Sequence, residues 1–516
     1  MSQQEAARVG RGLLPATTAA PWFGGLRQTA WLAPALGYAV TALALRWVLF
    51  GNPVVHIDEQ FCLLVGDRML HGAVPFVDMW DRKPIGLFLI YAAASWLGGG
   101  GVLAYQLLAC ASASLTALTI HMLARTIAPA RGAWLAGLGY LLFLMLFNCT
   151  GGQSPVFYNL PVALCVLWLV KIASRNDSAR LVWHGTGLML LAGLALQIKY
   201  TVVFEAACFG GVLLCRAFAD GASHRRMLAL AALWIAAAWL PTALALGWFA
   251  AMGHAHEFLQ ANFISIFYRN QPAGPALFRL AKEMLVLAPF WLAIFGTVRR
   301  LPAADGRYSA ARSVLTLWAL AAVGGFLVFG SWFDHYVAPI LPPLAVLAAP
   351  AFGSDGRGRL ATWLMLAVGG IGTIAVVTVN LHQRGNAEEV EAASALITSH
   401  LGGRCLYVFE AEPVLYRTTN ACILSRFVFP SHLSSTVEAD ALGVDQAREL
   451  NRIMTARPGV VVYSAKPIHT PANLQTRAIL QAYLAANYTA YATVPIGQNR
   501  FALYQLRDLT QRQAAR

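Results

Sequence analysis

The chain has 516 residues, of which 58% are hydrophobic and only 12% are charged. Soluble domains carry about 25% charged residues, so this composition excludes an ordinary soluble protein and indicates that lipid is the main solvent. The formal net charge of +14 does not indicate a nucleic-acid partner, because the basic residues lie in short segments between apolar runs, where the positive-inside rule accounts for them.

The apolar runs predict an α-helical polytopic membrane protein with about eleven transmembrane helices, because a spanning helix needs about 20 mostly apolar residues. Residues 1–29 contain Arg8, Arg11 and Arg27 but no apolar core. They therefore indicate a cytoplasmic leader and not a signal peptide. The candidate spans are residues 30–50, 102–127, 132–148, 154–171, 182–199, 201–218, 227–250, 283–299, 313–330, 336–351 and 360–380.

The distribution of basic residues predicts the orientation of these spans. If the N-terminus is inside, the inner connections at 171–180, 216–226 and 299–312 are rich in arginine and lysine, whereas the outer turn at 149–153 has no charge. This asymmetry follows the positive-inside rule. The C-terminus is then outside.

Three large segments face the outside in this topology. They are the first outer loop (51–101) and the second outer loop (251–282), both within a transmembrane domain of residues 30–381, and a tail of residues 382–516. The tail alternates helical and strand-like patterns, which predicts a small extramembrane α/β domain. The helical patterns cover 387–401, 445–456 and 472–486, and the strand-like runs are Cys405–Phe409, Val460–Tyr463, Tyr491–Pro495 and Phe501–Gln505.

Two of the eight cysteines, Cys405 and Cys422, lie in this polar tail. An oxidising compartment would allow a disulfide between them, and the sequence leaves open whether it forms. The other six cysteines are scattered, mostly within apolar segments, and are predicted to be small buried hydrophobic residues.

Asp58 and Glu59 directly follow the first predicted span. Two adjacent carboxylates at a membrane surface are costly to desolvate, which favours a function for them. They could supply a general base for an acceptor hydroxyl or an acid pair for a metal. The alternative is a helix cap with a solvated neighbour.

The pair Lys83-Pro84 predicts an anion site. A residue before proline favours an extended backbone, and Pro84 suits the first position of a helix. Lys83 would then lie beside the positive end of a helix with free N–H groups, where a lipid phosphate could bind. The alternative is an interfacial lysine that snorkels. The next stretch, 85–97, is too short to cross comfortably.

Other outer residues are weaker candidates. Lys199 and Arg269 are cations on the outer side, and both suit an anionic headgroup. The alternative is snorkelling for Lys199 and a solvated loop charge for Arg269. His335 could bind metal, phosphate or acceptor, or could belong to an aromatic belt. His254 and His256, with Glu257, give only a weak metal pattern.

Several short motifs follow one another in order. They are Asp58-Glu59, Gly72-x-x-Pro75-Phe76-x-Asp78-x-Trp80-Asp81-x-Lys83-Pro84, Gln197-Ile198-Lys199-Tyr200 and His335-Tyr336-Val337-Ala338-Pro339. Together they resemble the GT-C superfamily of membrane glycosyltransferases, which use polyprenyl-phosphate sugars and include the lipid A aminoarabinose transferases and the protein O-mannosyltransferases. The resemblance covers roughly residues 30–350.

This resemblance implies transfer of a sugar from a polyprenyl-phosphate carrier to a lipid, glycan or protein acceptor, with inversion, on the outer face of a bacterial inner membrane. By position, Asp58 corresponds to the catalytic base, and Glu59 to its partner or to a metal or acceptor contact. By the same carry-over, Lys83 and Lys199 would bind the donor phosphate, and Arg269, as an outer cation, is added to them as a candidate. The other predicted substrate or loop residues are Asp78, Asp81, His335 and Tyr336. No cofactor is indicated with certainty, and a divalent metal is left open.

The sequence departs from the family pattern at three positions. Some relatives have an acid where this chain has Arg82, many have a second proline where it has Ile85, and many have a later acid where Asn159 stands. A metal ligand at position 82 and a second carboxylate at position 159 are therefore in doubt.

Two other functions compete with this one. A lipid-linked sugar transporter or flippase would favour inverted repeats and ionisable residues at the membrane midplane, and the sequence contains neither in a clear form. A scaffold or sensor would use the tail as its working part. The sequence does not indicate the sugar, the acceptor or the oligomeric state.

Overall fold

The computed structural model describes residues 31–173, 180–270, 272–298, 306–328 and 330–509. The predicted leader, residues 1–29, lies outside the described residues. Eight described helical segments are long and apolar enough to cross a membrane, so the chain is an integral membrane protein. These segments are Leu32–Leu49, Val102–Ala124, Ser154–Ala173, Tyr200–Ala219, His224–Ala251, Ser309–Val328, Asp334–Phe352 and Gly358–His400.

The other three predicted spans fall on shorter helices. The segments at 132–148 and 182–199 correspond to α6 (Ala130–Leu146) and α8 (Leu181–Leu196). The segment at 283–299 is divided between α12 (Ala273–Val286) and α13 (Ala288–Val298), so the prediction of one continuous helix there is wrong. Pro289 lies just after the break. A proline has no backbone N–H to continue the hydrogen bonds of the preceding helix, and it disfavours a helical conformation in the residue before it.

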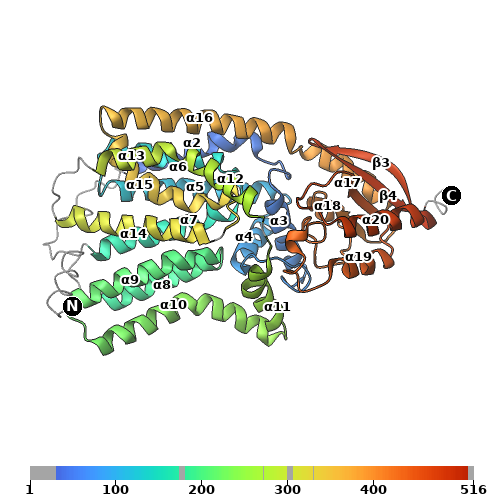
Figure 1. Cartoon of the computed structure of the whole chain (residues 1–516), viewed down its shortest axis with the longest axis horizontal. Coiled ribbons are helices and arrows are strands. Elements are labelled where there is room, and N and C mark those ends of the chain that lie inside the picture. The colour runs from blue at the N-terminus through green and yellow to red at the C-terminus, as the bar shows by residue number, and fades with distance from the viewer. Residues whose placement is uncertain (1–30, 174–179, 271, 299–305, 329, 510–516) are drawn as a thin grey trace. The chain divides into compact units, whose positions relative to one another are not determined.

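The chain divides into two compact units. The first unit consists of the described residues within 1–48, 108–245 and 273–376, and the second unit of those within 49–107, 246–272 and 377–516. Helices α2 (Leu32–Arg46), α7 (Ser154–Ala173), α9 (Val203–Ala219), α14 (Gly306–Val328) and α15 (Leu341–Phe352) belong to the first unit, and α5 (Val102–Ala124), α10 (His224–Ala251) and α16 (Arg357–Gln383) belong partly to each (Figure 1).

Small residues let helices of the first unit approach closely. A Cβ atom on Gly132 of α6 would lie 2.1 Å from the carbonyl oxygen of Ala349 in α15. A Cβ atom on Gly193 of α8 would lie 2.4 Å from the carbonyl oxygen of Ala238 in α10. Membrane helices associate through such close backbone contacts, because lipid supplies no hydrophobic driving force between them.

The first outer loop of the second unit folds into two helices, α3 (Ile57–Leu70) and α4 (Ile85–Trp96). Gly66 lets them meet, since a Cβ atom there would lie 2.5 Å from the backbone nitrogen of Ala92. Phe76, in the connection between them, is fully buried with φ of 69° and packs against Phe88 and Phe258. Aromatic packing therefore fixes this connection.

The tail contains a four-stranded sheet of order β1-β2-β4-β3. The strands β1 (Leu406–Phe409) and β2 (Val460–Ser464) are parallel and fully buried, as expected of parallel strands. The strands β3 (Tyr488–Ile496) and β4 (Asn499–Leu506) form an antiparallel hairpin, and β4 pairs with β2. The helices α17 (Ala387–His400) and α20 (Leu474–Asn487) pack against β3, and α19 (Gln446–Thr455) packs against α20 (Figure 1). The predicted α/β character is confirmed.

Cys405 and Cys422 form a disulfide, which settles the question that the sequence left open. Cys405 precedes β1, and Cys422 follows the short helix α18 (Val414–Thr418). The disulfide therefore links the residue before β1 to the residue that precedes segment 423–427. Of the other cysteines, Cys215 is exposed, so the prediction that it is buried is wrong.

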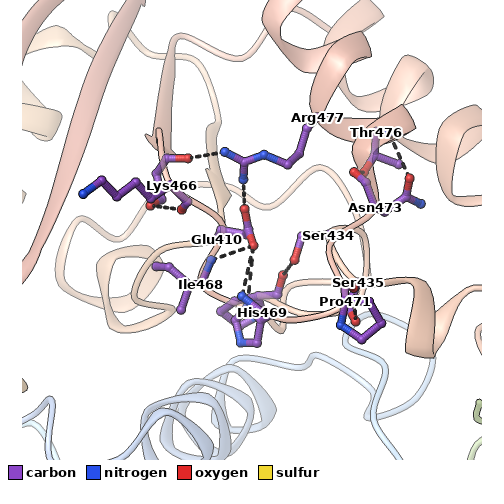
Figure 2. A network of polar contacts seen from close by, with 12 residues as sticks. Glu410, Ser434, Ser435, Lys466, Ile468, His469, Pro471, Asn473, Thr476 and Arg477 are labelled. Atoms are coloured by element: carbon purple, nitrogen blue, oxygen red, sulfur yellow. Dashed lines mark hydrogen bonds and ion pairs between the residues drawn. The ribbon is translucent and has the colours of Figure 1, made fainter. Parts of the chain in front are cut away.

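A buried ion pair anchors the loop between β2 and α20 (Figure 2). The Glu410 carboxylate, directly after β1, pairs with the Arg477 guanidinium. Glu410 also accepts hydrogen bonds from two backbone N–H groups of that loop. The carbonyl of Pro471, in the same loop, accepts a hydrogen bond from the backbone N–H of Thr436 at 3.1 Å. The network thus fixes the segment that carries Glu438.

Candidate functional site

Helix α3 begins at the acid pair, and its cap is His56. The His56 backbone is extended, and Nδ1 accepts a hydrogen bond from the backbone N–H of Asp58 at 3.2 Å. Burial lowers the pKa of His56 to about 4, and the nearby Asp58 carboxylate only partly opposes this. The ring is therefore neutral at pH 7 and able to accept. The alternative in which Asp58 caps the helix is wrong, because His56 does so.

Lys83 joins two carboxylates of the first outer loop. Its Nζ lies 3.1 Å from Oδ1 of Asp58 and 2.9 Å from Oδ2 of Asp81. The side chains of all three residues are largely buried, with 10% to 19% of their surface exposed. Burial lowers the pKa of Lys83, but the Asp81 and Asp58 carboxylates outweigh it and hold the pKa well above its ordinary value. Lys83 is therefore positively charged and lies between the two carboxylates of Asp58 and Asp81.

A tight turn positions this lysine. Oδ1 of Asp81 accepts hydrogen bonds from the backbone N–H groups of Arg82 and Lys83, at 2.6 and 3.0 Å. Pro84 has ψ of 153° and is the cap of α4, which begins at Ile85. The prediction of Pro84 as the first helical residue is therefore wrong by one position, because its backbone is still extended there.

Aromatic rings complete the surroundings of Lys83. Its Nζ lies 5.6 Å from the centre of the Phe61 ring and 5.2 Å from that of Phe429. These two rings meet edge to face, with centres 5.4 Å apart. The faces of such rings attract a cation at these distances. The lysine thus has a fixed position set by the first outer loop and the tail together.

A second charged group lies in the same unit and joins three segments of the chain. Glu438 of the tail accepts a hydrogen bond from Nη2 of Arg82 at 2.6 Å. It also pairs with Nε of Arg269, from the second outer loop, at 2.9 Å. Burial raises the pKa of Glu438, but the two arginines outweigh it and hold the pKa at about 2. We call Arg82, Arg269 and Glu438 the arginine clamp.

His432 connects the two charged groups. It is 3% exposed and packs edge to face on Trp80, with ring centres 5.0 Å apart. Burial lowers its pKa to about 3, although Asp81 and Glu438 act in the opposite direction. His432 is therefore neutral at pH 7, and its ring packs near both Asp81 and Glu438.

Glu59 faces a different environment from Asp58. It is 1% exposed, near the start of α3. Consecutive helical positions point about 100° apart, so the two side chains leave the helix in different directions. The alternative of a solvated Glu59 is wrong, and its partnership with Asp58 stays a prediction.

The first unit brings other predicted residues together. Nζ of Lys199 lies 5.1 Å from the centre of the Tyr336 ring, and His335 packs edge to face on the same ring at 4.6 Å. Lys199 and Tyr336 line a small cavity of about 30 Å³ with Tyr158 and Glu205. Glu205, in the first turn of α9, is 3% exposed. This cavity has room for about one water molecule.

The remaining candidates have structural contacts. Oδ2 of Asp78 accepts the backbone N–H of Val74 at 2.7 Å, and this aspartate is exposed. Nδ2 of Asn159 donates to the carbonyl of Ala338 at 3.1 Å. His254 lies 3.7 Å from Glu257, but within the described residues no group of three His, Cys, Asp or Glu side chains could hold a metal.

No protein-family model and no curated protein sequence matches the chain. Solved structures do match. ArnT from Cupriavidus metallidurans bound to undecaprenyl phosphate is 15% identical, covers 94% of this chain and 99% of its own, and superposes with a TM-score of 0.62. The Archaeoglobus fulgidus oligosaccharyltransferase AglB in complex with an inhibitory peptide and a dolichol-phosphate is 13% identical, covers 93% and 74%, and has a TM-score of 0.51. The chain has the GT-C fold. The resemblance seen in its motifs is thereby confirmed at the level of fold.

Two residues in this GT-C fold were not predicted as part of the site. Glu438 and His432 lie in the tail, and Glu438 is 356 positions from its partner Arg82. No local motif marks either residue. The aromatic residues Phe427 and Phe429 are a nearby sequence signal that could have indicated a packed surface in this part of the tail.

Proposed function

We propose that this chain is an inverting GT-C glycosyltransferase that moves a sugar from a polyprenyl-phosphate carrier to an acceptor hydroxyl. The observation that carries the proposal is the Asp58–Lys83–Asp81 arrangement, in which a carboxylate and a charged lysine are held 3.1 Å apart in a largely buried loop. The fold supports it, because the matched ArnT and AglB structures contain undecaprenyl phosphate and a dolichol-phosphate respectively.

Asp58 acts as the general base. Its pairing with Lys83 keeps the carboxylate ionised, as a base must be. Asp58 takes the proton of the acceptor hydroxyl, and the oxygen forms a bond to the anomeric carbon. The bond from that carbon to the carrier phosphate breaks at the same time, and the phosphate leaves with the electron pair. A single displacement of this kind inverts the anomeric carbon.

Lys83 stabilises the departing phosphate. An ammonium group has three N–H donors, and Asp58 and Asp81 account for two of them. The third can donate to a phosphate oxygen on which charge develops, and such fixed donors are usually a large part of catalysis. Lys199 and Arg269 are proposed as further phosphate contacts, and His335 and Tyr336 as substrate contacts.

The residues present do not fit a divalent metal at this position. The Lys83 ammonium lies between Asp58 and Asp81, so the chain supplies its own cation there. Arg82, at the position where some relatives have an acid, pairs with Glu438. No step is therefore assigned to a metal.

The proposed location is the outer face of a bacterial inner membrane, with the N-terminus in the cytoplasm and the tail in the periplasm. The arginine-rich inner segments support this orientation. The Cys405–Cys422 disulfide supports an oxidising compartment for the tail.

Binding of undecaprenyl phosphate to the purified protein in nanodiscs tests the donor site. Lys83→Met should weaken binding at least about tenfold, since a hydrogen bond to a charged group contributes roughly 1.5–3 kcal/mol. Lys466→Met, at an exposed lysine of the tail, is the matched control and should bind as the wild type does. Equal binding by Lys83→Met and the wild type would remove Lys83 from the donor site.

Proteoliposomes separate the transferase from the flippase. A transferase yields a sugar-linked acceptor and free polyprenyl phosphate, whereas a flippase moves the intact lipid-linked sugar. Translocation of unmodified donor without any sugar-linked product would reject the proposed function.

A further inference from the structure

The tail holds helix α3 close to the proposed base. Gln60 lies two residues after Asp58 and is 2% exposed. Its Nε2 donates a hydrogen bond to Oε2 of Glu412 at 2.6 Å, and its Oε1 accepts one from the backbone N–H of Val414 at 3.3 Å. Glu412 lies between β1 and α18, and Val414 begins α18. One side chain of the first outer loop is therefore bound by two neighbouring groups of the tail.

This contact uses both ends of the Gln60 amide. A side-chain amide has its donor and its acceptor in a fixed geometry, so Gln60 satisfies both partners in one orientation only. Hydrogen bonds that a carboxylate accepts are roughly twice as strong as those between neutral groups. The tail therefore fixes both the position and the orientation of the Gln60 side chain.

The tail segment that binds Gln60 is itself held at both ends. Glu410, two residues before Glu412, is fully buried and paired with Arg477 (Figure 2). The backbone N–H of Val408, in β1, donates a hydrogen bond to the hydroxyl of Tyr416, in α18, at 2.9 Å. Glu412 therefore belongs to a segment that the sheet of the tail keeps in place.

Helical geometry places this segment and Lys83 on different sides of α3. Positions two apart project about 200° apart around a helix, so Asp58 and Gln60 leave α3 on nearly opposite sides. Gln60 meets the tail segment, whereas Oδ1 of Asp58 lies 3.1 Å from Nζ of Lys83. Arg68, about two turns further along α3, donates to the carbonyl of Ala421 at 2.9 Å. The tail thus holds the helix near both of its ends.

The first turn of a helix is its least supported part, because its first four N–H groups have no partner within the helix. In α3, His56 accepts one of these groups, the N–H of Asp58. The Gln60 contact adds a second fixed point in the same turn. A rotation of this turn would displace the Asp58 carboxylate, and a displacement of about 1 Å at a reacting group can cost about 100-fold in rate.

We propose that Gln60 and Glu412 are positioning residues, through which the tail fixes the first turn of α3 and directs the Asp58 carboxylate toward the acceptor hydroxyl. Neither residue is assigned a contact with the donor or the acceptor. Their effect on sugar transfer rests on the proposed function. The fixing of α3 by the tail does not, and it can be measured without any substrate.

Sugar transfer by Glu412 variants in proteoliposomes tests the proposal. Glu412→Leu removes the acceptor for Gln60 and should lower kcat by about 10–100-fold. The KM for the donor should not change, because Lys83 keeps both of its carboxylates. Glu412→Gln keeps an acceptor oxygen and should restore most of the rate. Glu391→Leu, at an exposed acid of α17, is the matched control and should have the wild-type kcat.

An exchange of the two side chains separates direct contact from a general loss of stability. Gln60→Glu sets a second carboxylate against Glu412 and should lower kcat as Glu412→Leu does. Adding Glu412→Gln should restore kcat, because the introduced amide donates to the introduced carboxylate, whose other oxygen still accepts from Val414. No recovery in this double variant, or a wild-type kcat in Glu412→Leu, would overturn the proposal.

Hydrogen exchange of the full chain in nanodiscs measures the fixing of α3 directly. Glu412→Leu should accelerate amide exchange in residues 59–64 by about tenfold, the factor expected when one hydrogen bond to a charged group is lost. Exchange in the β3–β4 hairpin should not change, because local opening is confined to the released turn. Equal exchange of residues 59–64 in Glu412→Leu and the wild type would also overturn the proposal.

Failure of this proposal and failure of the proposed function give different results. Faster exchange in Glu412→Leu, with no sugar transfer by the wild type from any donor, would retain the contact between the tail and α3 and reject the enzyme. Sugar transfer at the wild-type rate by Glu412→Leu would retain the enzyme and reject the positioning role.

Discussion

Replacing Glu438 with glutamine should destabilise the second unit markedly. Glu438 is 2% exposed, and its carboxylate accepts hydrogen bonds from Arg82 at 2.6 Å and from Arg269 at 2.9 Å. Glutamine keeps the shape but removes the charge, and its amide group cannot accept from two guanidinium groups in the same way. The substitution leaves two cations of the arginine clamp close together and without their shared acid.

The expected size follows from the burial of the three side chains. Removing one partner of a buried ion pair costs about 3–5 kcal/mol. The side chains of Arg82 and Arg269 are 17% and 20% exposed, so water screens part of the loss, and we expect about 2–3 kcal/mol. For a unit of this size, that lowers the unfolding temperature by about 4–12 °C, measurable by tryptophan fluorescence in nanodiscs.

A double-mutant cycle isolates the contact. Arg269→Gln should destabilise the wild type but have little effect in the Glu438→Gln background. Glu388→Gln, at an exposed acid of α17, should leave the unfolding temperature unchanged. A coupling below about 0.5 kcal/mol, the level at which independent sites are additive, would refute the clamp as a stabilising contact.

Three further changes test other parts of the tail. Reducing the Cys405–Cys422 disulfide, which spans 17 positions, should lower the free energy of unfolding by about 3 kcal/mol; an unfolding temperature indifferent to reductant would contradict this. The unfolding temperature should fall from pH 7 to pH 5. In the unfolded chain His432 takes up a proton near its ordinary pKa of about 6.5, whereas in the folded protein its pKa is about 3 and it stays neutral. That group alone loses about 2 kcal/mol at pH 5, and an equal decline in His432→Phe would exclude it as a cause. Arg477→Met leaves the buried Glu410 carboxylate without its ion-pair partner and should lower the free energy of unfolding by about 3–5 kcal/mol. The loss should appear as faster trypsin cleavage, and wild-type cleavage rates would argue against the network.

Most of the fold was predictable because its signals are local. The apolar runs gave the spanning helices, since spanning length is set by the bilayer. The alternating patterns of the tail gave its helices and strands within a few residues, because period and turn residues encode them. The divided helix at Leu287 was missed, because its break depends on Pro289 in an otherwise uniform apolar run.

The candidate site was predictable only in part. Asp58 and Lys83 were identified because a charge in an apolar chain is conspicuous, and Asp81 because it lies in the same motif. Their mutual ion pairs were not predicted, because they depend on how the turn at Asp81 directs Lys83. Glu438 could not be predicted, because its partners Arg82 and Arg269 lie 356 and 169 positions away and one acid in a polar tail carries no local signal.

The burial of Glu59, beside the less buried Asp58, also required the structure. Adjacent acids in a sequence suggest a shared role, but helical geometry turns them apart. His56 as a cap was missed for a related reason: a histidine caps only when it is neutral, and burial makes it so.

Sugar transfer by Asp58→Asn tests the central claim most directly. Wild-type protein in proteoliposomes, supplied with polyprenyl-phosphate sugars and acceptor lipid, should form a sugar-linked product. Asp58→Asn should reduce the turnover by about 10²–10⁴-fold, as loss of a general base does, with an unchanged unfolding temperature. Asp67→Asn, on the same helix, should turn over normally. Normal turnover by Asp58→Asn would contradict the account.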